Sequence, residues 1–208
     1  MGRIPENTLR RLTHYLRCMQ RLAEQGRDEI QSKDLAAYCK VSDSLVRRDL
    51  SYFGEFGKRG KGYSISILLP KIREIVGLDK ERNIAVVGIG NIGRALLNYP
   101  FHRFNFKVVA GFDIKPELVG KEINGVPIYH IDEIGRVAKE KDISIAIVAV
   151  PEEAGDAVKE KIITAGIRGI LSFVLLRGPF PKEVWVRYIE LPSELEILSF
   201  YMEKGGVI

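Results

Sequence analysis

The chain has 208 residues, of which 46% are hydrophobic and 28% charged, a balance typical of a globular protein with one large or two small domains. Its apolar runs are far shorter than the roughly 20 residues of a membrane helix, and residues 1–8 hold no apolar stretch of the signal-peptide type. These features argue against a membrane partner, and we expect a cytoplasmic protein. Two cysteines, Cys18 and Cys39, are not spaced as paired metal ligands; we expect small core residues, with a redox switch as the alternative.

The surplus positive charge lies in the first third of the chain. Residues 1–77 carry 15 Lys and Arg against 9 Asp and Glu, whereas residues 78–208 carry 17 against 18. A basic module joined to a near-neutral one is typical of a nucleic-acid-binding domain attached to a sensor. A solvated basic surface would have the same composition.

The first predicted element is a helix that starts with Pro5 in its first turn and ends at Gly26. Apolar residues recur along it every three or four positions, which predicts one face packed on a core. These residues are Leu9, Leu12, Leu16, Met19 and Leu22.

Two shorter helices follow and predict a helix-turn-helix. Ser32 is expected to cap the first, and Ser42 to cap the second, which runs to Phe53. The residues expected to face outward from the second are Ser44, Arg47, Arg48, Ser51 and Tyr52. Arginines on such a helix can bind guanine edges and phosphates in a major groove. The alternative is a solvated face whose arginines pair with Asp43 or Asp49.

A basic, glycine-rich segment comes next. Lys58, Arg59 and Lys61 lie between glycines, before an alternating stretch in which Tyr63, Ile65 and Ile67 share one side. This pattern predicts a β-hairpin with a cationic tip that lies along a DNA backbone or enters a minor groove. A helix-turn-helix followed by a hairpin is a winged helix, so residues 1–77 are predicted to bind double-stranded DNA; an ordinary exposed turn is the alternative.

The second predicted domain, residues 78–191, opens with a buried strand at residues 83–87 that runs into Gly-Ile-Gly-Asn-Ile-Gly and then a helix. A G-x-G-x-x-G between a strand and a helix is the dinucleotide-binding fingerprint. Its first glycine permits the tight turn, the second lets the backbone approach a pyrophosphate, and the third lets the helix pack closely. The predicted ligand-binding residues of this loop are Gly88, Ile89, Gly90, Asn91, Ile92 and Gly93.

The next strand, residues 106–112, ends at Asp113, 20 residues after Gly93. An acid at this place accepts hydrogen bonds from the adenosine ribose and repels a 2′-phosphate, which favours NAD over NADP. Ile114 and Lys115 are expected beside it, and the charge of Lys115 weighs mildly against that preference. The alternative is that Asp113 caps the turn before Pro116.

The rest of the domain alternates between strands and helices, as a doubly wound parallel sheet does. Strands are expected at residues 126–129, 143–150, 167–173 and 185–189, and helices at residues 131–139 and 152–165. Ala149, Val150 and Pro151 follow the carboxyl end of one strand, where they are expected to form a wall beside the cofactor.

The third predicted segment, residues 192–208, holds an amphipathic helix at residues 192–204 with Ser193 as its cap. Because it follows a completed sheet, we expect it to pack against another subunit. Packing on its own sheet is the alternative.

An NAD-dependent oxidoreductase is the competing function class. Only 19 residues follow Ile189, too few for a substrate domain, and no tyrosine has a lysine four residues later. The sequence gives no partner that would orient His14, His102 or His130 as a general base. We therefore expect no enzyme activity; a nucleotide-gated regulatory subunit without DNA affinity is the third class.

Residues 47–63, Arg-Arg-Asp-Leu-Ser-Tyr-Phe-Gly-Glu-Phe-Gly-Lys-Arg-Gly-Lys-Gly-Tyr, closely resemble the signature of the Rex family, the redox-sensing transcriptional repressors of bacteria. The similarity continues through the glycine loop, Asn98-Tyr99, Phe112-Asp113, Ala149-Val-Pro151 and the final helix. The fold class expected is therefore α/β: a winged helix, a Rossmann domain and a C-terminal helix that is swapped between subunits.

The resemblance implies a homodimer that binds an inverted-repeat operator when NAD+ dominates and leaves it when NADH rises. It implies that Tyr99 lies near the nicotinamide and couples the nucleotide to the domain arrangement together with residue 190. Relatives commonly have Asp where this chain has Glu190, and many have Asn in place of Ser172. At these two positions, which the family uses for the coupling and nicotinamide contacts, the chain departs from the family's pattern.

Overall fold

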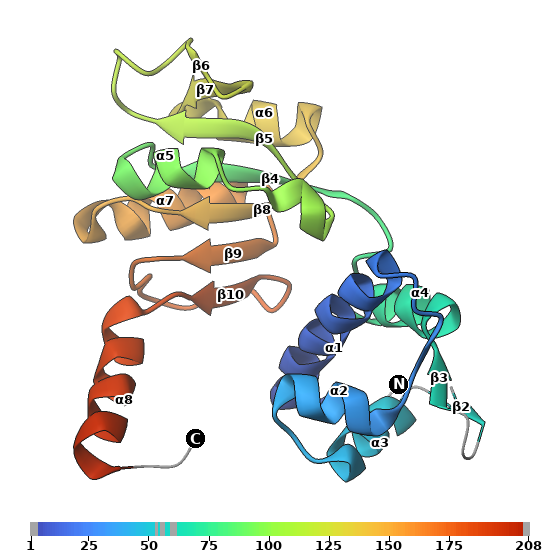
Figure 1. Ribbon diagram of the computed structural model, residues 1–208. Coiled ribbons are helices and arrows are strands. Elements are labelled where there is room, and N and C mark those ends of the chain that lie inside the picture. Colours follow the sequence, from blue (N-terminus) through green and yellow to red (C-terminus); the bar gives the residue numbers. More distant parts are fainter. Residues whose placement is uncertain (1–3, 53, 55–56, 59–61, 206–208) are drawn as a thin grey trace. The chain divides into compact units, whose positions relative to one another are not determined.

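Contacts divide the chain into two compact units, Met1–Lys80 and Glu81–Ile208 (Figure 1). The computed structural model describes residues 4–52, 54, 57, 58 and 62–205. Each unit encloses a hydrophobic core of its own.

The first unit is built on α1 (Glu6–Glu24), which begins directly after Pro5 and is followed by Gly26 with a φ of +76°. The predicted apolar stripe faces the core: Leu12, Leu16 and Met19 are buried, and Leu9 and Leu22 pack at its margin.

The helix-turn-helix consists of α2 (Ser32–Cys39) and α3 (Asp43–Ser51). Ser42 caps α3 as predicted, because its hydroxyl accepts the N–H of Leu45 at 3.2 Å. The prediction that Ser32 caps α2 is wrong by one residue. Gln31 is the cap, and its N–H donates to the Asp34 carboxylate at 3.2 Å.

A small antiparallel sheet joins β1 (Glu29–Ile30), β3 (Gly62–Ser64) and β2 (Gly57–Lys58) in that order. The pair of β2 and β3 is the predicted hairpin, whereas β1 is too short to leave a sequence signal. Phe53, Arg59 and Lys61 lie outside the described residues.

The strand predicted to continue through Ile67 ends at Ser64, where α4 (Ile65–Ile75) begins. One face of this helix is buried in the core, and it consists of Ile65, Leu68 and Ile72. Pro70 within the helix obscured the pattern, because an interior proline ordinarily argues against a helix.

Both cysteines are free thiols, Cys18 buried and Cys39 partly buried. Burial, reinforced by Cys39, raises the pKa of Cys18 to about 11, and burial raises the pKa of Cys39. Both thiols are therefore protonated at neutral pH. Across the described residues, no group of three or more His, Cys, Asp and Glu side chains could hold a metal ion.

The second unit contains a seven-stranded sheet in the order β10-β9-β8-β4-β5-β7-β6. All neighbouring strands are parallel except β6 and β7. The strands are β4 (Arg82–Val87), β5 (Phe106–Asp113), β6 (Glu122–Ile123), β7 (Val126–His130), β8 (Ile143–Val148), β9 (Gly169–Ser172) and β10 (Trp185–Tyr188). Apart from β6, this is the doubly wound order of the Rossmann fold, and it reverses between β4 and β8.

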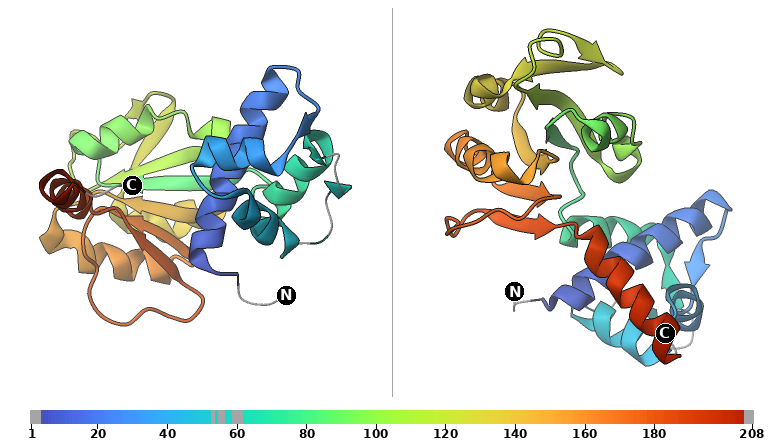
Figure 2. Two further views of the ribbon diagram at one scale, coloured as in Figure 1. Left: turned by 60° about the horizontal axis from the view of Figure 1, so that its bottom comes forward. Right: turned by 90° about the vertical axis from the view of Figure 1, so that its left-hand side faces the viewer.

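Helices cover both faces of this sheet (Figure 2). On one face lie α6 (Ile134–Glu140), preceded by η2 (Ile131–Glu133), and α7 (Glu152–Thr164); on the other lie α5 (Asn91–Leu97) and η1 (Phe101–Phe104). Each face of the sheet has its own hydrophobic core, and successive side chains of β4 point to opposite faces. Ala85 and Val87 pack with α6 and α7, and Val86 packs with α5.

The last helix, α8 (Leu191–Lys204), leaves the sheet at its β10 edge and covers neither face (Figure 1). It contains no buried residue, so the alternative of packing on its own sheet is not what the described chain does. Ser193 is not its cap: the cap is Glu190, whose carboxylate accepts the Ser193 hydroxyl at 3.0 Å. None of the described helices is both long and apolar enough to span a bilayer.

Candidate functional sites

The three glycines of the loop after β4 each meet a different steric demand. Gly88 has a φ of +90°, and a Cβ on it would lie 2.5 Å from the carbonyl oxygen of Ala149. A Cβ on Gly93 would lie 1.9 Å from the carbonyl oxygen of Gly88, whereas a Cβ on Gly90 would meet nothing within 4 Å. Gly88 and Gly93 thus fold the turn, and Gly90 leaves its outer side open to a ligand.

The residues between these glycines point in opposite directions. Ile89 is 1% exposed and packs in the core with Leu97, so only its backbone reaches the loop surface. Asn91 and Ile92, in the first turn of α5, are exposed. Backbone N–H groups in the first turn of a helix have no acceptor within the helix, so those of Asn91 and Ile92 are suited to bind an anionic group.

Asp113, at the carboxyl end of β5, joins the glycine loop to the turn that follows its own strand. Its Oδ2 accepts the N–H of Ile89 at 2.7 Å, and its Oδ1 accepts those of Ile114 and Lys115 at 2.8 and 3.0 Å. The turn cap that the sequence offers as the alternative is therefore present. A carboxylate has about four acceptor positions, so capacity remains for a hydroxyl donor.

The carboxyl ends of β4 and β8 lie side by side at the point where the strand order reverses. The N–H of Ala149 donates to the carbonyl of Val87 at 2.8 Å, and Val150 would contact a Cβ on Gly88. Ala149, Val150 and Pro151 therefore border the glycine loop, at the crevice where such sheets bind ligands.

Tyr99 and Glu190 make separate contacts in the described chain. The Tyr99 ring is 51% exposed and lies against Phe101 and Phe104, with centroids 4.7 and 6.3 Å away. Glu190 is exposed and accepts from Ser193. Tyr99 therefore packs within the segment that follows α5, whereas Glu190 lies at the start of α8.

Ser172 is buried, with 0% of its surface exposed. Its hydroxyl donates to the carbonyl of Val174 at 2.6 Å and accepts the N–H of the same residue at 3.2 Å. The side chain therefore orders the turn after β9.

All five predicted outward residues of α3 are exposed: Ser44, Arg47, Arg48, Ser51 and Tyr52. Arg47 donates to Asp43 at 2.5 Å and to the Ser32 hydroxyl at 3.2 Å, so the predicted pairing with Asp43 exists. Within the described part of the chain, the Arg48 guanidinium has no ion-pair or hydrogen-bond partner. Lys58 belongs to β2 of the hairpin.

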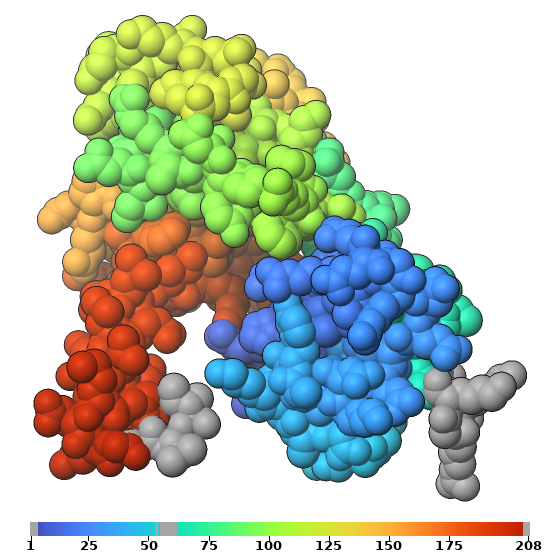
Figure 3. Space-filling model, in the orientation of Figure 1, coloured from blue at the N-terminus to red at the C-terminus, as the bar shows by residue number. Residues whose placement is uncertain are grey.

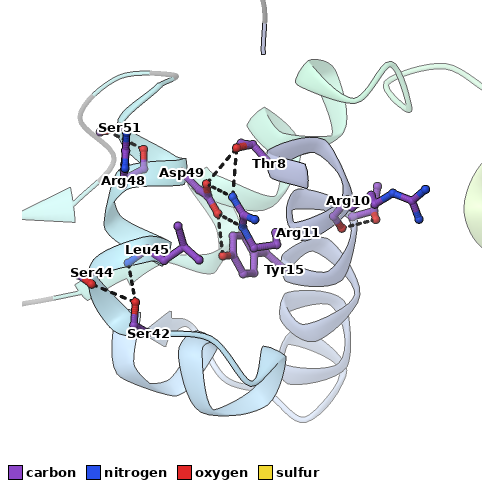
Figure 4. Close-up of polar contacts among 11 residues, drawn as sticks. Thr8, Arg10, Arg11, Tyr15, Ser42, Ser44, Leu45, Arg48, Asp49 and Ser51 are labelled. Atoms are coloured by element: carbon purple, nitrogen blue, oxygen red, sulfur yellow. Dashed lines mark hydrogen bonds and ion pairs between the residues drawn. The ribbon is translucent and has the colours of Figure 1, made fainter. Parts of the chain in front are cut away.

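Asp49 is the functional candidate that the sequence did not reveal (Figure 4). It is 1% exposed on the inner side of α3, and its carboxylate binds three side chains of α1. Arg11 donates through Nε to Oδ2 at 2.6 Å and through Nη2 to Oδ1 at 2.8 Å. Tyr15 donates to Oδ2 at 2.9 Å and Thr8 to Oδ1 at 3.2 Å. Burial opposes the charge, but these donors hold the pKa of Asp49 below its ordinary value.

Comparison with known proteins matches both units. Residues 79–175 match the family described as "CoA binding domain", and residues 3–51 match the family described as "Putative DNA-binding protein N-terminus". The redox-sensing transcriptional repressor Rex of Lactobacillus gasseri is 40% identical over 97% of this chain and 94% of its own length. The chain belongs to the Rex family. The Rex repressor of Listeria monocytogenes is 37% identical over the same shares of the two chains.

Solved structures of a Rex-family repressor, RSP, share the fold along the whole chain. RSP in complex with NAD+ and operator DNA has a TM-score of 0.91 and 29% identity, covering 99% of this chain and 95% of that one. RSP in complex with NADH has a TM-score of 0.85 and 27% identity, covering 99% and 97%. The predicted Rex resemblance and the predicted fold class, apart from the exchange of α8, are confirmed.

Proposed function

We propose that this chain is a redox-sensing transcriptional repressor that binds an inverted-repeat operator as a homodimer and leaves it when NADH binds. The observation that carries the proposal is 40% identity to a Rex repressor over 97% of the chain, spanning the basic helix-turn-helix and the dinucleotide loop together. A repressor acts where the chromosome lies, which supports the cytoplasm as its compartment. Residues 1–77 would bind DNA, 78–191 the nucleotide and 192–208 the partner subunit.

NAD+ and NADH would occupy the crevice between the glycine loop and the wall formed by Ala149, Val150 and Pro151. The open side of Gly90 suits the pyrophosphate, and the remaining acceptor capacity of Asp113 suits the adenosine ribose. The carboxylate charge would repel a 2′-phosphate, which favours NAD over NADP. Ile114 and Lys115, both exposed beside Asp113, would flank the adenosine.

Double-stranded DNA would contact the exposed side of α3 and the hairpin. Arg48, which lacks a protein partner among the described residues, is the strongest candidate for a base or phosphate contact. Ser44, Arg47, Ser51 and Tyr52 share its side of the helix, and Lys58, Arg59 and Lys61 would add backbone or minor-groove contacts from the hairpin.

The partner subunit would cover α8, whose side chains stand free of the sheet to which the helix is connected (Figure 3). Seven large apolar side chains of α8 are 37–77% exposed: Leu191, Leu195, Ile197, Leu198, Phe200, Tyr201 and Met202. A second copy of the chain is the occupant that the symmetry of an inverted repeat demands, and exchange of α8 between copies would bury these residues.

Sensing would depend on the nicotinamide ring alone. NAD+ and NADH share the adenosine and pyrophosphate and differ in the charge and planarity of that ring, so only contacts there can shift the equilibrium between DNA-bound and released dimers. We assign this role to Tyr99, coupled with Glu190. The bond from Ser193 to Glu190 would have to yield or adapt when the glutamate engages another group.

The test is a fluorescence-anisotropy titration of a labelled promoter duplex that contains an inverted repeat, with NADH added against a fixed NAD+ concentration. We expect release as NADH rises and no comparable release by NADPH. Equal binding at every ratio of the two coenzymes would contradict the proposal, and turnover of NADH with a small alcohol or hydroxy acid would favour an oxidoreductase.

A further inference from the structure

Helix α3 is held in the first unit by two kinds of contact. Val46 and Leu50 pack in the apolar core, where attraction depends on area and hardly on direction. The Asp49 carboxylate instead accepts two N–H groups of the planar Arg11 guanidinium, one on each of its oxygens. The bidentate pair therefore fixes an orientation as well as a distance.

We propose that Arg11, with Tyr15 and Thr8, sets the rotation of α3 about its own axis through Asp49, and so acts as a positioning residue for operator discrimination. The inference rests on the proposed function and extends it to residues that do not face DNA. Arg48 precedes Asp49 directly in the helix, so the angle at which it leaves α3 follows the angle at which Asp49 is held.

The size of the effect follows from helix geometry. The Cα atoms of a helix lie about 2.3 Å from its axis, and a carboxylate extends to about 5 Å. A rotation of about 20° would move such a group by about 2 Å, which breaks hydrogen bonds that need about 2.7–3.2 Å between heavy atoms. Because the Arg48 side chain is longer, its guanidinium would move further and miss a base edge.

A buried ion pair adds little net stability compared with apolar side chains of the same volume. The Arg11 side chain is 23% exposed and that of Asp49 1%, so the aspartate is withdrawn from water while the arginine retains some contact with it. What an apolar contact could not replace is therefore the fixed orientation that the bidentate pair imposes on α3.

The decisive variant is Arg11→Lys. Lysine keeps the charge beside Asp49 but is a point charge without the planar fork. The probes are a duplex that the wild-type protein enriches from a random-sequence pool and a scrambled duplex of the same length and composition. We expect the ratio of the two affinities to fall about tenfold, the size of one lost bidentate base contact, with scrambled-duplex affinity and NADH affinity unchanged.

Arg10→Lys is the matched control. Arg10 neighbours Arg11 on α1, but it pairs with Glu6 on the surface, where the two side chains are 63% and 60% exposed. We expect this variant to keep the wild-type ratio. A tenfold fall in the control as well would overturn the inference.

Tyr15→Phe provides a second measurement that does not depend on the charge. It removes one donor to Asp49 and keeps the ring, and we expect a smaller fall of the ratio in the same direction. Wild-type discrimination in Arg11→Lys, or in Tyr15→Phe should Arg11→Lys not fold, would overturn the inference. Failure of the wild-type protein to enrich any duplex would instead contradict the proposed function.

Discussion

Asp113 joins two turns of the fold through the two oxygens of one carboxylate. Its two oxygens hold the backbone of Ile89 on one side and of Ile114 and Lys115 on the other. The spacing from the glycine loop and the possible turn cap were visible in the sequence, but the bond to Ile89 was not, because it depends on the ends of β4 and β5 being adjacent.

Asp113→Ala should weaken NAD+ and NADH alike. The variant loses a charge-assisted acceptor for the shared ribose and releases the glycine loop, so we expect about 1.5–3 kcal/mol less binding free energy for each coenzyme. Isothermal titration calorimetry measures both affinities. Asp156→Ala, on the exposed side of α7, is the control; a loss confined to one coenzyme would contradict the shared-ribose assignment.

Tyr99→Phe should separate binding from response. The phenol is exposed, so its removal costs little stability, and the ring keeps its contacts with Phe101 and Phe104. We expect nearly unchanged affinity for both coenzymes and a several-fold higher NADH concentration for DNA release. Equal loss of release in this variant and in Asp113→Ala, at saturating NADH, would count against that division of roles.

Asp49 should make the first unit sensitive to acid. Its pKa lies below the ordinary 3.8, because the donors from Arg11 and Tyr15 outweigh the opposing effect of burial. The ionised form is therefore stabilised by folding, and that stability is complete above the ordinary pKa and lost as pH falls through the lowered value.

Asp49→Asn tests this by urea unfolding at several pH values. We expect a cost of about 3 kcal/mol at neutral pH, as for a broken buried ion pair, and a cost that shrinks below about pH 4. Asp43→Asn, whose pair with Arg47 is surface-exposed, should change little. A pH-independent cost at Asp49 would show that its charge does not matter.

The elements that could be predicted are those with a strong hydrophobic periodicity or with capping residues and glycines at their ends. The β-branched strands, the glycine loop, the Ser42 cap and the terminal helix all leave local signals, and most bounds agree with the structure to within a few residues. Helix α4 was missed because Pro70 interrupts its pattern, and β1 because two residues carry no periodicity.

The cluster around Asp49 could not be predicted because it is non-local. Its hydrogen bonds join residues 34–41 positions apart, and nothing in the sequence shows which residues of α1 meet the inward side of α3. The sequence offered Asp49 as a partner of the neighbouring arginines, whereas packing of the two helices assigns it to Arg11.

On α3 itself, neighbouring arginines should contribute unequally to DNA binding. Arg47 must leave Asp43 and Ser32 to reach DNA, whereas Arg48 has no such described partner to lose. We expect Arg48→Ala to cost about 1–3 kcal/mol on the operator and Arg47→Ala less. Anisotropy with operator and scrambled duplexes measures both, and a larger loss for Arg47→Ala would reverse the assignment.

At the scale of the whole molecule, the apolar face of α8 requires a partner. Leu198→Glu places a charge among side chains that we expect to be buried between subunits, and it should convert dimers to monomers at micromolar concentration. Sedimentation velocity measures the change. Ile67→Glu makes the same substitution at another exposed apolar residue, 64% exposed on α4, and should leave the mass unchanged. A dimeric Leu198→Glu variant would remove α8 from the interface.

The bonds from Asp113 to both flanking turns have a consequence for what the protein can measure. On the proposed assignment, these bonds shape the adenosine end of a site that both redox forms share, because NAD+ and NADH carry the same adenosine. When two ligands compete for one binding site, hardly any protein remains unliganded once the total coenzyme concentration exceeds both dissociation constants. Occupancy then carries no information about the size of that pool, and the fraction of promoter held by the repressor follows the proportion of reduced to oxidised coenzyme.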